Sequence, residues 1–170
     1  DYVLGFIQPG LIEKDVSAEL EYRMTKGGAE GLAFETICVA GANSSRPHGV
    51  PGGYKLQKGD FITMDFGCIY GGYCSDMTRT FFTAEPTEHQ RRVYETVRAA
   101  NEAAEALVRP GVTFAEIDRA ARSIIEDAGW GEYFTHRLGH QIGLVDHEPG
   151  DVSSTHDEPV RPGQIFSIEP

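Results

Sequence analysis

The residues best suited to chemistry are two aspartates eleven positions apart, Asp65 and Asp76. They lie in an apolar segment, Met64 to Phe82, that is interrupted by Gly71-Gly72. A Gly-Gly pair favours a tight hairpin turn, which would fold the second strand back along the first and bring the carboxylates together. Buried carboxylates are costly unless they are paired or hold a cation. The pair therefore predicts a divalent metal site, with two surface or capping aspartates near a turn as the alternative.

Further ligand types lie downstream of the aspartates. The run from Phe134 to Glu148 contains three of the six histidines, and Glu169 follows an apolar run as Asp65 does. Two aspartates, a histidine and a glutamate would form an oxygen-rich donor set. Such a set suits Mn²⁺, Co²⁺, Fe²⁺ or Zn²⁺ better than a soft copper(I) site would.

The composition is that of one soluble domain. The chain has 170 residues, of which 40% are hydrophobic and 24% charged,. Its net charge of −11 argues against nucleic acid as a partner, and no apolar run approaches the 18 or so residues of a membrane span,. The three cysteines, Cys38, Cys68 and Cys74, match no zinc spacing. They indicate buried free thiols in a reducing, cytoplasmic compartment.

The sequence predicts mostly helices as the elements that position these residues. Apolar spacing predicts amphipathic helices between Pro9 and Gly27 and between Pro110 and Gly129, and a longer helix from Thr87 to Leu107,. Thr113 and Glu116 form a capping box at one helix start. Residues 43–53 are rich in turn formers and predict a loop that carries His48,.

The chain also contains a faint repeat. The predicted helix that follows Pro9 and the one that follows Pro110 are offset by 101 residues. The strand ending at Asp65 matches the one ending at Glu169 with an offset of 104. Chance similarity of two apolar strands is the alternative. A real repeat predicts two αβ halves related by a pseudo-two-fold, with Asp65 and Glu169 equivalent. The partner of Asp76 would then fall near position 180, so the second half is expected to be incomplete.

These motifs resemble those of the metallopeptidases with the pita-bread fold, which include methionine aminopeptidases, aminopeptidase P and prolidase. The resemblance covers nearly the whole chain and rests on the Asp pair, on Arg46 to Gly49, on Gly139 to Glu148 and on Ile168 to Pro170. The run from His136 to His140 is most similar to prolidase and aminopeptidase P. The resemblance implies an α+β pita-bread (creatinase/aminopeptidase) fold. Residues 1–170 would form a catalytic domain that is incomplete at its C-terminus and lacks the family's N-terminal domain.

The resemblance also implies a dinuclear metal centre. Asp65 would chelate one ion, Asp76 would bridge the pair, and His140 and Glu169 would hold the second ion. A fifth ligand of the family, a bridging Glu, lies on a later strand that this chain does not reach, so the fragment itself could be inactive. The resemblance implies two divalent ions, manganese first, with cobalt, zinc and iron as alternatives. Two such ions lower the pKa of a shared water, and the resulting hydroxide can attack an amide carbon.

Three histidines and one departure complete the expected site. Glu169 would take up and pass on a proton. His147 would hydrogen-bond the substrate carbonyl, and His48 would help place the scissile bond. His136 would line the proline side of the pocket. A structural role for His136 and a loop-ordering role for His48 are the alternatives. His89 and His156 lie in polar surroundings, and we expect both to be exposed. Gln141 stands where the family usually has Gly, and we expect it to crowd the site or alter the local backbone.

The expected activity is hydrolysis of the N-terminal bond of a peptide with proline at the second position, by a dipeptidase or an aminopeptidase. The alternatives are a methionine aminopeptidase, a creatinase-like hydrolase without metal, and a non-catalytic binding protein of the same fold. Charge and apolar run length predict neither nucleic acid nor membrane as a partner, and the resemblance allows a homodimer,.

Overall fold

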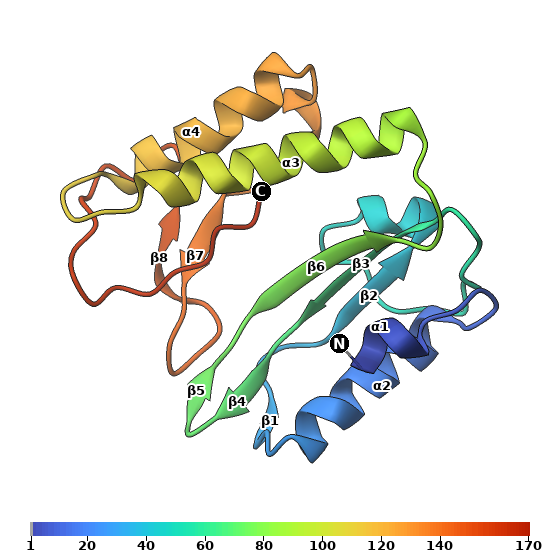
Figure 1. Cartoon of the computed structure of the whole chain (residues 1–170). Coiled ribbons are helices and arrows are strands. Elements are labelled where there is room, and N and C mark those ends of the chain that lie inside the picture. The colour runs from blue at the N-terminus through green and yellow to red at the C-terminus, as the bar shows by residue number, and fades with distance from the viewer. Residues whose placement is uncertain (1) are drawn as a thin grey trace. The chain divides into compact units, whose positions relative to one another are not determined.

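Asp65 lies on the central strand of an antiparallel sheet of order β2-β3-β6. These strands span β2 (Ile37–Ala40), β3 (Phe61–Phe66) and β6 (Met77–Phe82). They belong to a computed structural model that describes residues 2–170 (Figure 1). The model divides between Thr87 and Glu88 into two compact units, called unit 1 and unit 2 below.

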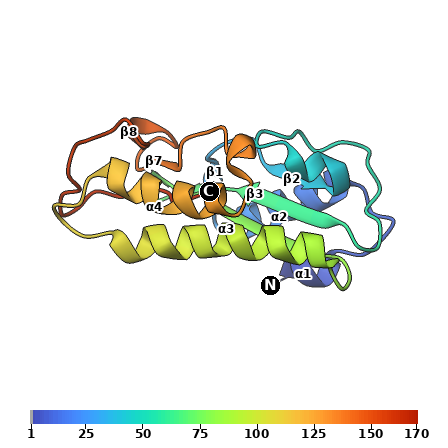
Figure 2. The same ribbon diagram turned by 90° about the horizontal axis from the view of Figure 1, so that it is seen from above.

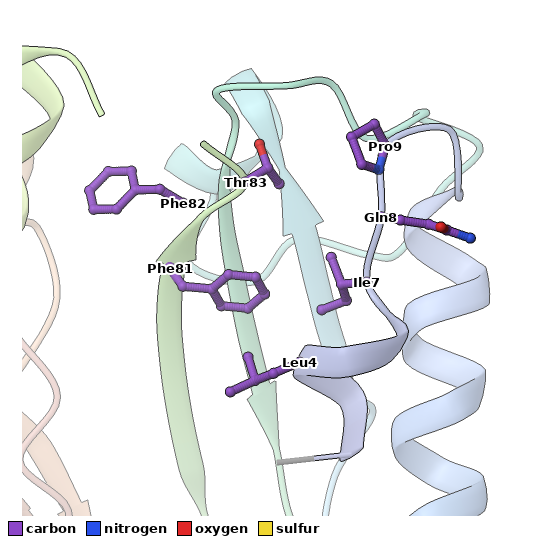
Figure 3. A pocket seen from close by; sticks show the side chains of 7 residues that line it. All are labelled: Leu4, Ile7, Gln8, Pro9, Phe81, Phe82 and Thr83. Atoms are coloured by element: carbon purple, nitrogen blue, oxygen red, sulfur yellow. The ribbon is translucent and has the colours of Figure 1, made fainter. Parts of the chain in front are cut away.

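In unit 1, two helices pack on the strands. They are α1 (Tyr2–Phe6) and α2 (Glu13–Lys26), and Val16 and Leu20 of α2 join Ile62 and Met64 of β3 in one apolar cluster. Leu4 and Ile7 also line a small cavity with Phe81, Phe82, Gln8 and Thr83, in which the Phe81 ring points toward the two aliphatic side chains (Figure 3). That lining contains no ionisable group, so the cavity offers no acid-base chemistry.

The predicted hairpin is present but interrupted. Gly71 and Gly72 have φ angles of 59° and 78° and form the turn between β4 (Cys68–Tyr70) and β5 (Tyr73–Cys74). The short strand β1 (Gly31–Leu32) pairs with β4. No disulfide joins cysteines within residues 2–170, but Cys68 and Cys74 are only half-buried, so the expectation of buried thiols holds for Cys38 alone. Burial raises the pKa of the Cys38 thiol to about 12, which keeps it protonated and unreactive,.

Unit 2 is built on two long helices, α3 (Glu88–Leu107) and α4 (Phe114–Asp127), which lie side by side in both views (Figures 1 and 2). The apolar stripe of α4 packs on Ala100 and Ala104 of α3 and on Leu138 and Val152. The predicted capping box is confirmed, since Thr113 Oγ1 accepts from Glu116 N at 3.1 Å. The returned hydrogen bond from Thr113 N lowers the pKa of the Glu116 carboxyl.

The strands of unit 2 are short. They are β7 (Gly139–Gln141) and β8 (Glu148–Val152), which pair antiparallel after a 3₁₀ turn at Gly131–Tyr133. The strand expected to end at Glu169 is reduced to one bridge, between Gln141 and Phe166, although its backbone still follows β7. No helix within residues 2–170 is both long and apolar enough to cross a bilayer.

The two units repeat one hydrogen-bonding pattern, each within itself. In unit 1, Gly10 N donates to Leu56 O and Leu56 N to Leu11 O. In unit 2, the same two bonds join residues 101 or 104 positions later: Gly111 N to Val160 O, and Val160 N to Val112 O. The strand registers match with the same offsets, because Ile37 pairs with Asp65 and Leu138 O accepts from Glu169 N. The repeat is therefore real, and Asp65 and Glu169 occupy equivalent positions.

Candidate active site

Asp65 and Asp76 share one face of the sheet in unit 1. Asp65 pairs directly with Thr78 across the β3–β6 ladder. Because side chains alternate along a strand, Asp76, two residues before Thr78, is directed to the same face as Asp65. Diagonal neighbours of this kind remain within reach of one another through their side chains. Both aspartates are half-buried. The structure thus places Asp65 on β3 and Asp76 directly before β6, the strand that pairs with β3.

Gly67 allows the chain that carries Asp76 to close on β3. A Cβ atom on Gly67 would collide with the carbonyl oxygen of Ser75, the residue before Asp76. Ser75 N donates to Cys68 O at 2.9 Å, and the Ser75 hydroxyl accepts from Cys68 N at 3.1 Å. Sequence reasoning missed Gly67, although an isolated glycine within a strand pattern signals such a close approach.

In unit 2, the structure brings together His140 and Glu169. His140 lies on β7 with only 3% of its surface exposed, and its Nε2 is 3.3 Å from Glu169 Oε1. His140 Nδ1 lies 3.2 Å from the carbonyl oxygen of Gln141. The ring tautomer decides which contact carries the proton: Nδ1–H can donate to that carbonyl, or Nε2–H to the carboxylate,. An imidazole nitrogen and a carboxylate oxygen at this distance can bind one cation.

Ser167 holds this pair in place. Its hydroxyl donates to Glu169 Oε1 at 3.0 Å and accepts from His140 N at 3.0 Å, and Ser167 N donates to His140 O at 2.8 Å. The approach is possible because position 139 is a glycine, where a Cβ would collide with the Ser167 carbonyl. Gly139 therefore permits a close backbone approach in unit 2, as Gly67 does in unit 1. The sequence did not predict these roles for Gly139 and Ser167.

His147 lies next to His140. The two ring centroids are 4.0 Å apart, and about half of the His147 side chain is exposed. Its Nε2 is 3.4 Å from Asp146 Oδ2, and Glu148 Oε1 accepts from Leu144 N at 2.7 Å. Asp146 can therefore orient the imidazole, while Glu148 orders the loop that carries it.

Gln141 lies against β8. Its side-chain amide occupies the space that a Cβ on Gly150 would take, and Gly150 has a φ of 115°. The bulge between His140 and Gln141 is the local backbone irregularity at this position, and φ of Gln141 is not positive. The Gln141 side chain is thus accommodated by the missing side chain at Gly150.

His136 is exposed, but its backbone is held by a buried ion pair. Arg122 donates to Asp118, which is fully buried, through two bonds of 2.8 and 2.9 Å. The same guanidinium donates to the carbonyl oxygens of Phe134 and His136 at 3.0 Å each. The bond to Asp118 raises the pKa of Arg122. The signal missed in the sequence was an Asp on the apolar stripe of α4, four residues before an Arg.

Three further histidines have different surroundings. His48 is exposed, in the loop after the 3₁₀ turn Gly41–Ser45. His89 is exposed, as predicted. The predicted exposure of His156 is wrong, because its ring is half-buried and stacks on Phe114 with centroids 4.7 Å apart.

The fold is that of the metallopeptidases of the pita-bread class. The model of metallopeptidase family M24 matches residues 1–170, and the chain belongs to this family. An uncharacterized peptidase of Staphylococcus saprophyticus is 41% identical over 167 residues, which are 98% of this chain and 48% of that relative.

Two solved structures share the fold. The prolidase from Pyrococcus furiosus has a TM-score of 0.95 at 39% identity, with 98% of this chain and 49% of that one covered. The Xaa-Pro dipeptidase from Bacillus anthracis has a TM-score of 0.96 at 40% identity, with 98% and 47% covered. The chain thus spans about half the length of the relatives it matches. The predicted fold class is confirmed.

Proposed function

We propose that residues 1–170 belong to the catalytic domain of a metal-dependent peptidase that hydrolyses the N-terminal Xaa-Pro bond of short peptides. The observation that carries the proposal is the His140–Glu169 pair, held 3.3 Å apart by Ser167. The two similar structures named above, a prolidase and an Xaa-Pro dipeptidase, support the choice of substrate. The three cysteines, which form no disulfide within residues 2–170, support a cytoplasmic location,.

The same proposal assigns two divalent cations to Asp65, Asp76, His140 and Glu169. The chemistry of the residues fits this assignment, because two carboxylates share a face in unit 1 and an imidazole Nε2 lies 3.3 Å from a carboxylate oxygen in unit 2,. Manganese is our first choice, with cobalt, zinc and iron as alternatives. When bound, such ions supply a water of lowered pKa and polarise the scissile carbonyl.

The protein's own residues move protons and bind the peptide. Glu169 is proposed to accept the proton of the attacking water and to deliver it to the leaving amine. Ser167, which donates to Glu169 Oε1, fixes that carboxylate. His147 would donate to the carbonyl oxygen of the substrate, oriented by Asp146,. We propose that His48 places the scissile bond and that His136 lines the proline side.

The test is a substrate comparison with the natural full-length protein. We expect Mn²⁺-dependent cleavage of Ala-Pro peptides that exceeds cleavage of Ala-Ala and Met-Ala peptides. Asp76→Asn should lower kcat by orders of magnitude, because it removes the charge of a proposed bridging ligand. Asp157→Asn, at an exposed position, serves as the control and should leave kcat unchanged. Faster cleavage of Met-Ala than of Ala-Pro would contradict the assigned substrate.

A further inference from the structure

A fully buried carboxylate lies outside the groups described so far. Glu13, the first residue of α2, is 0% exposed. Its Oε1 accepts from Ala40 N at 2.8 Å and from Asn43 Nδ2 at 3.1 Å, and its Oε2 accepts from Gly52 N at 2.8 Å. Burying a carboxylate is costly unless it is hydrogen-bonded, and three donors together with the N-terminus of a helix offset that cost.

The internal repeat shows that the fold does not require a charge at this position. With the offset of 101, Glu13 corresponds to Phe114 at the start of α4. The backbone contacts are equivalent, because Glu13 N donates to Tyr54 O and Phe114 N to Glu158 O. Phe114 is also 0% exposed, and it packs among apolar residues. An apolar ring therefore serves the same helix start in unit 2, so the carboxylate in unit 1 calls for another explanation.

The three donors point to one segment. Ala40 ends β2, Asn43 lies in the 3₁₀ turn Gly41–Ser45, and Gly52 follows the loop that contains His48. Glu13 therefore ties both ends of residues 40–52 to the first turn of α2. Between these ties, residues 46–51 belong to no helix or strand. A loop without regular structure depends on such anchors for its position.

We propose that Glu13 is a positioning residue that fixes the loop of residues 40–52 and thereby places the His48 imidazole for the peptidase reaction. This inference rests on the proposed function, and in particular on the role of His48. Glu13 itself touches no reacting atom. Its carboxylate acts only through the two backbone amides and the Asn43 side chain.

The test is a double-mutant cycle in the natural full-length protein, with Ala-Pro peptides and Mn²⁺. Glu13→Gln replaces one acceptor oxygen by an amino group that cannot accept from Ala40 N or Gly52 N. We expect kcat/KM to fall about 10- to 100-fold, because small displacements of positioning groups have effects of that size. In a His48→Ala background the same substitution should change kcat/KM by less than about threefold, because the two residues act as one unit.

Two controls make the result interpretable. Glu105→Gln, at an exposed position of α3, should leave kcat/KM unchanged. If Glu13→Gln does not fold, Asn43→Ala takes its place, because it removes only the 3.1 Å bond and keeps both backbone bonds.

Three outcomes would overturn the inference: an undiminished effect in the His48→Ala background, wild-type kinetics for a folded Glu13→Gln protein, or full activity of His48→Ala. The proposed function fails separately, by the absence of metal-dependent hydrolysis in the wild-type protein.

Discussion

At the scale of single residues, two glycines decide how closely the proposed ligands can approach. Gly67 and Gly139 each face a serine carbonyl, of Ser75 and Ser167 respectively, at a distance that no Cβ tolerates. Each serine is followed within two residues by a proposed ligand, Asp76 or Glu169. The positions of Asp76 and Glu169 therefore depend on the absence of a side chain at Gly67 and Gly139.

Gly139→Ala should damage the site without removing any proposed ligand. The new methyl group must push back the Ser167 backbone and with it Glu169, so we expect kcat for Ala-Pro peptides to fall by at least tenfold, and overpacking to destabilise the fold by about 1–3 kcal/mol,. Steady-state kinetics and urea unfolding measure both effects. Gly31→Ala is the matched control, since its Cβ would meet no atom within 4 Å. Equal behaviour of the two variants would refute this role of Gly139.

Residue types were predictable from the sequence, but their contacts were not. Asp65, Asp76, His140 and Glu169 stand out as ligand types in apolar surroundings. Ser167 does not, because a serine is ordinary in any strand and its partner His140 lies 27 positions away. The exposure of His156 was predicted wrongly for the same reason, since stacking on Phe114 is a tertiary contact.

At the scale of elements, α4 both fills the core and holds a loop. Its apolar stripe includes Ile117, Ala121 and Ile125, and Asp118 is buried among them. Arg122, four residues later, satisfies that carboxylate and donates to the carbonyls of Phe134 and His136. One helix thus anchors the segment that leads into β7.

Arg122→Met should destabilise the protein strongly. It leaves the Asp118 carboxylate buried without its guanidinium, a change that typically costs about 3–5 kcal/mol,. The unfolding free energy in urea measures the loss. Arg119→Met alters the same helix at an exposed position and should change stability by less than about 0.5 kcal/mol,. If both variants unfold alike, the ion pair does not stabilise the fold.

Long elements were predicted and short ones were missed. The three helices, the Gly71-Gly72 turn and the Thr113 cap follow from apolar periodicity and capping chemistry,. The strands β2 and β7 were not predicted, because three or four residues are too few to show alternation. The strand expected before Glu169 is a single bridge, since it pairs with a β7 of only three residues.

At the scale of the whole molecule, equivalent positions of the two repeats carry side chains of the same or of different chemistry. Asp65 and Glu169 occupy the same register position in the two units, whereas His140 corresponds to the buried Val39 of β2. Glu13 and Phe114 are likewise equivalent, but one is a carboxylate and the other an apolar ring. One scaffold thus occurs twice, with different side chains where the proposed chemistry requires them.

The central claim is that the proposed peptidase reaction needs divalent metal. The most direct measurement is the rate of Ala-Pro hydrolysis by the natural protein after exhaustive chelation and during readdition of Mn²⁺. We predict no activity after chelation and recovery with Mn²⁺ for the wild type. Neither Asp65→Asn, in unit 1, nor His140→Ala, in unit 2, should recover. Full activity in the chelated wild type, or normal recovery of either variant, would contradict the claim.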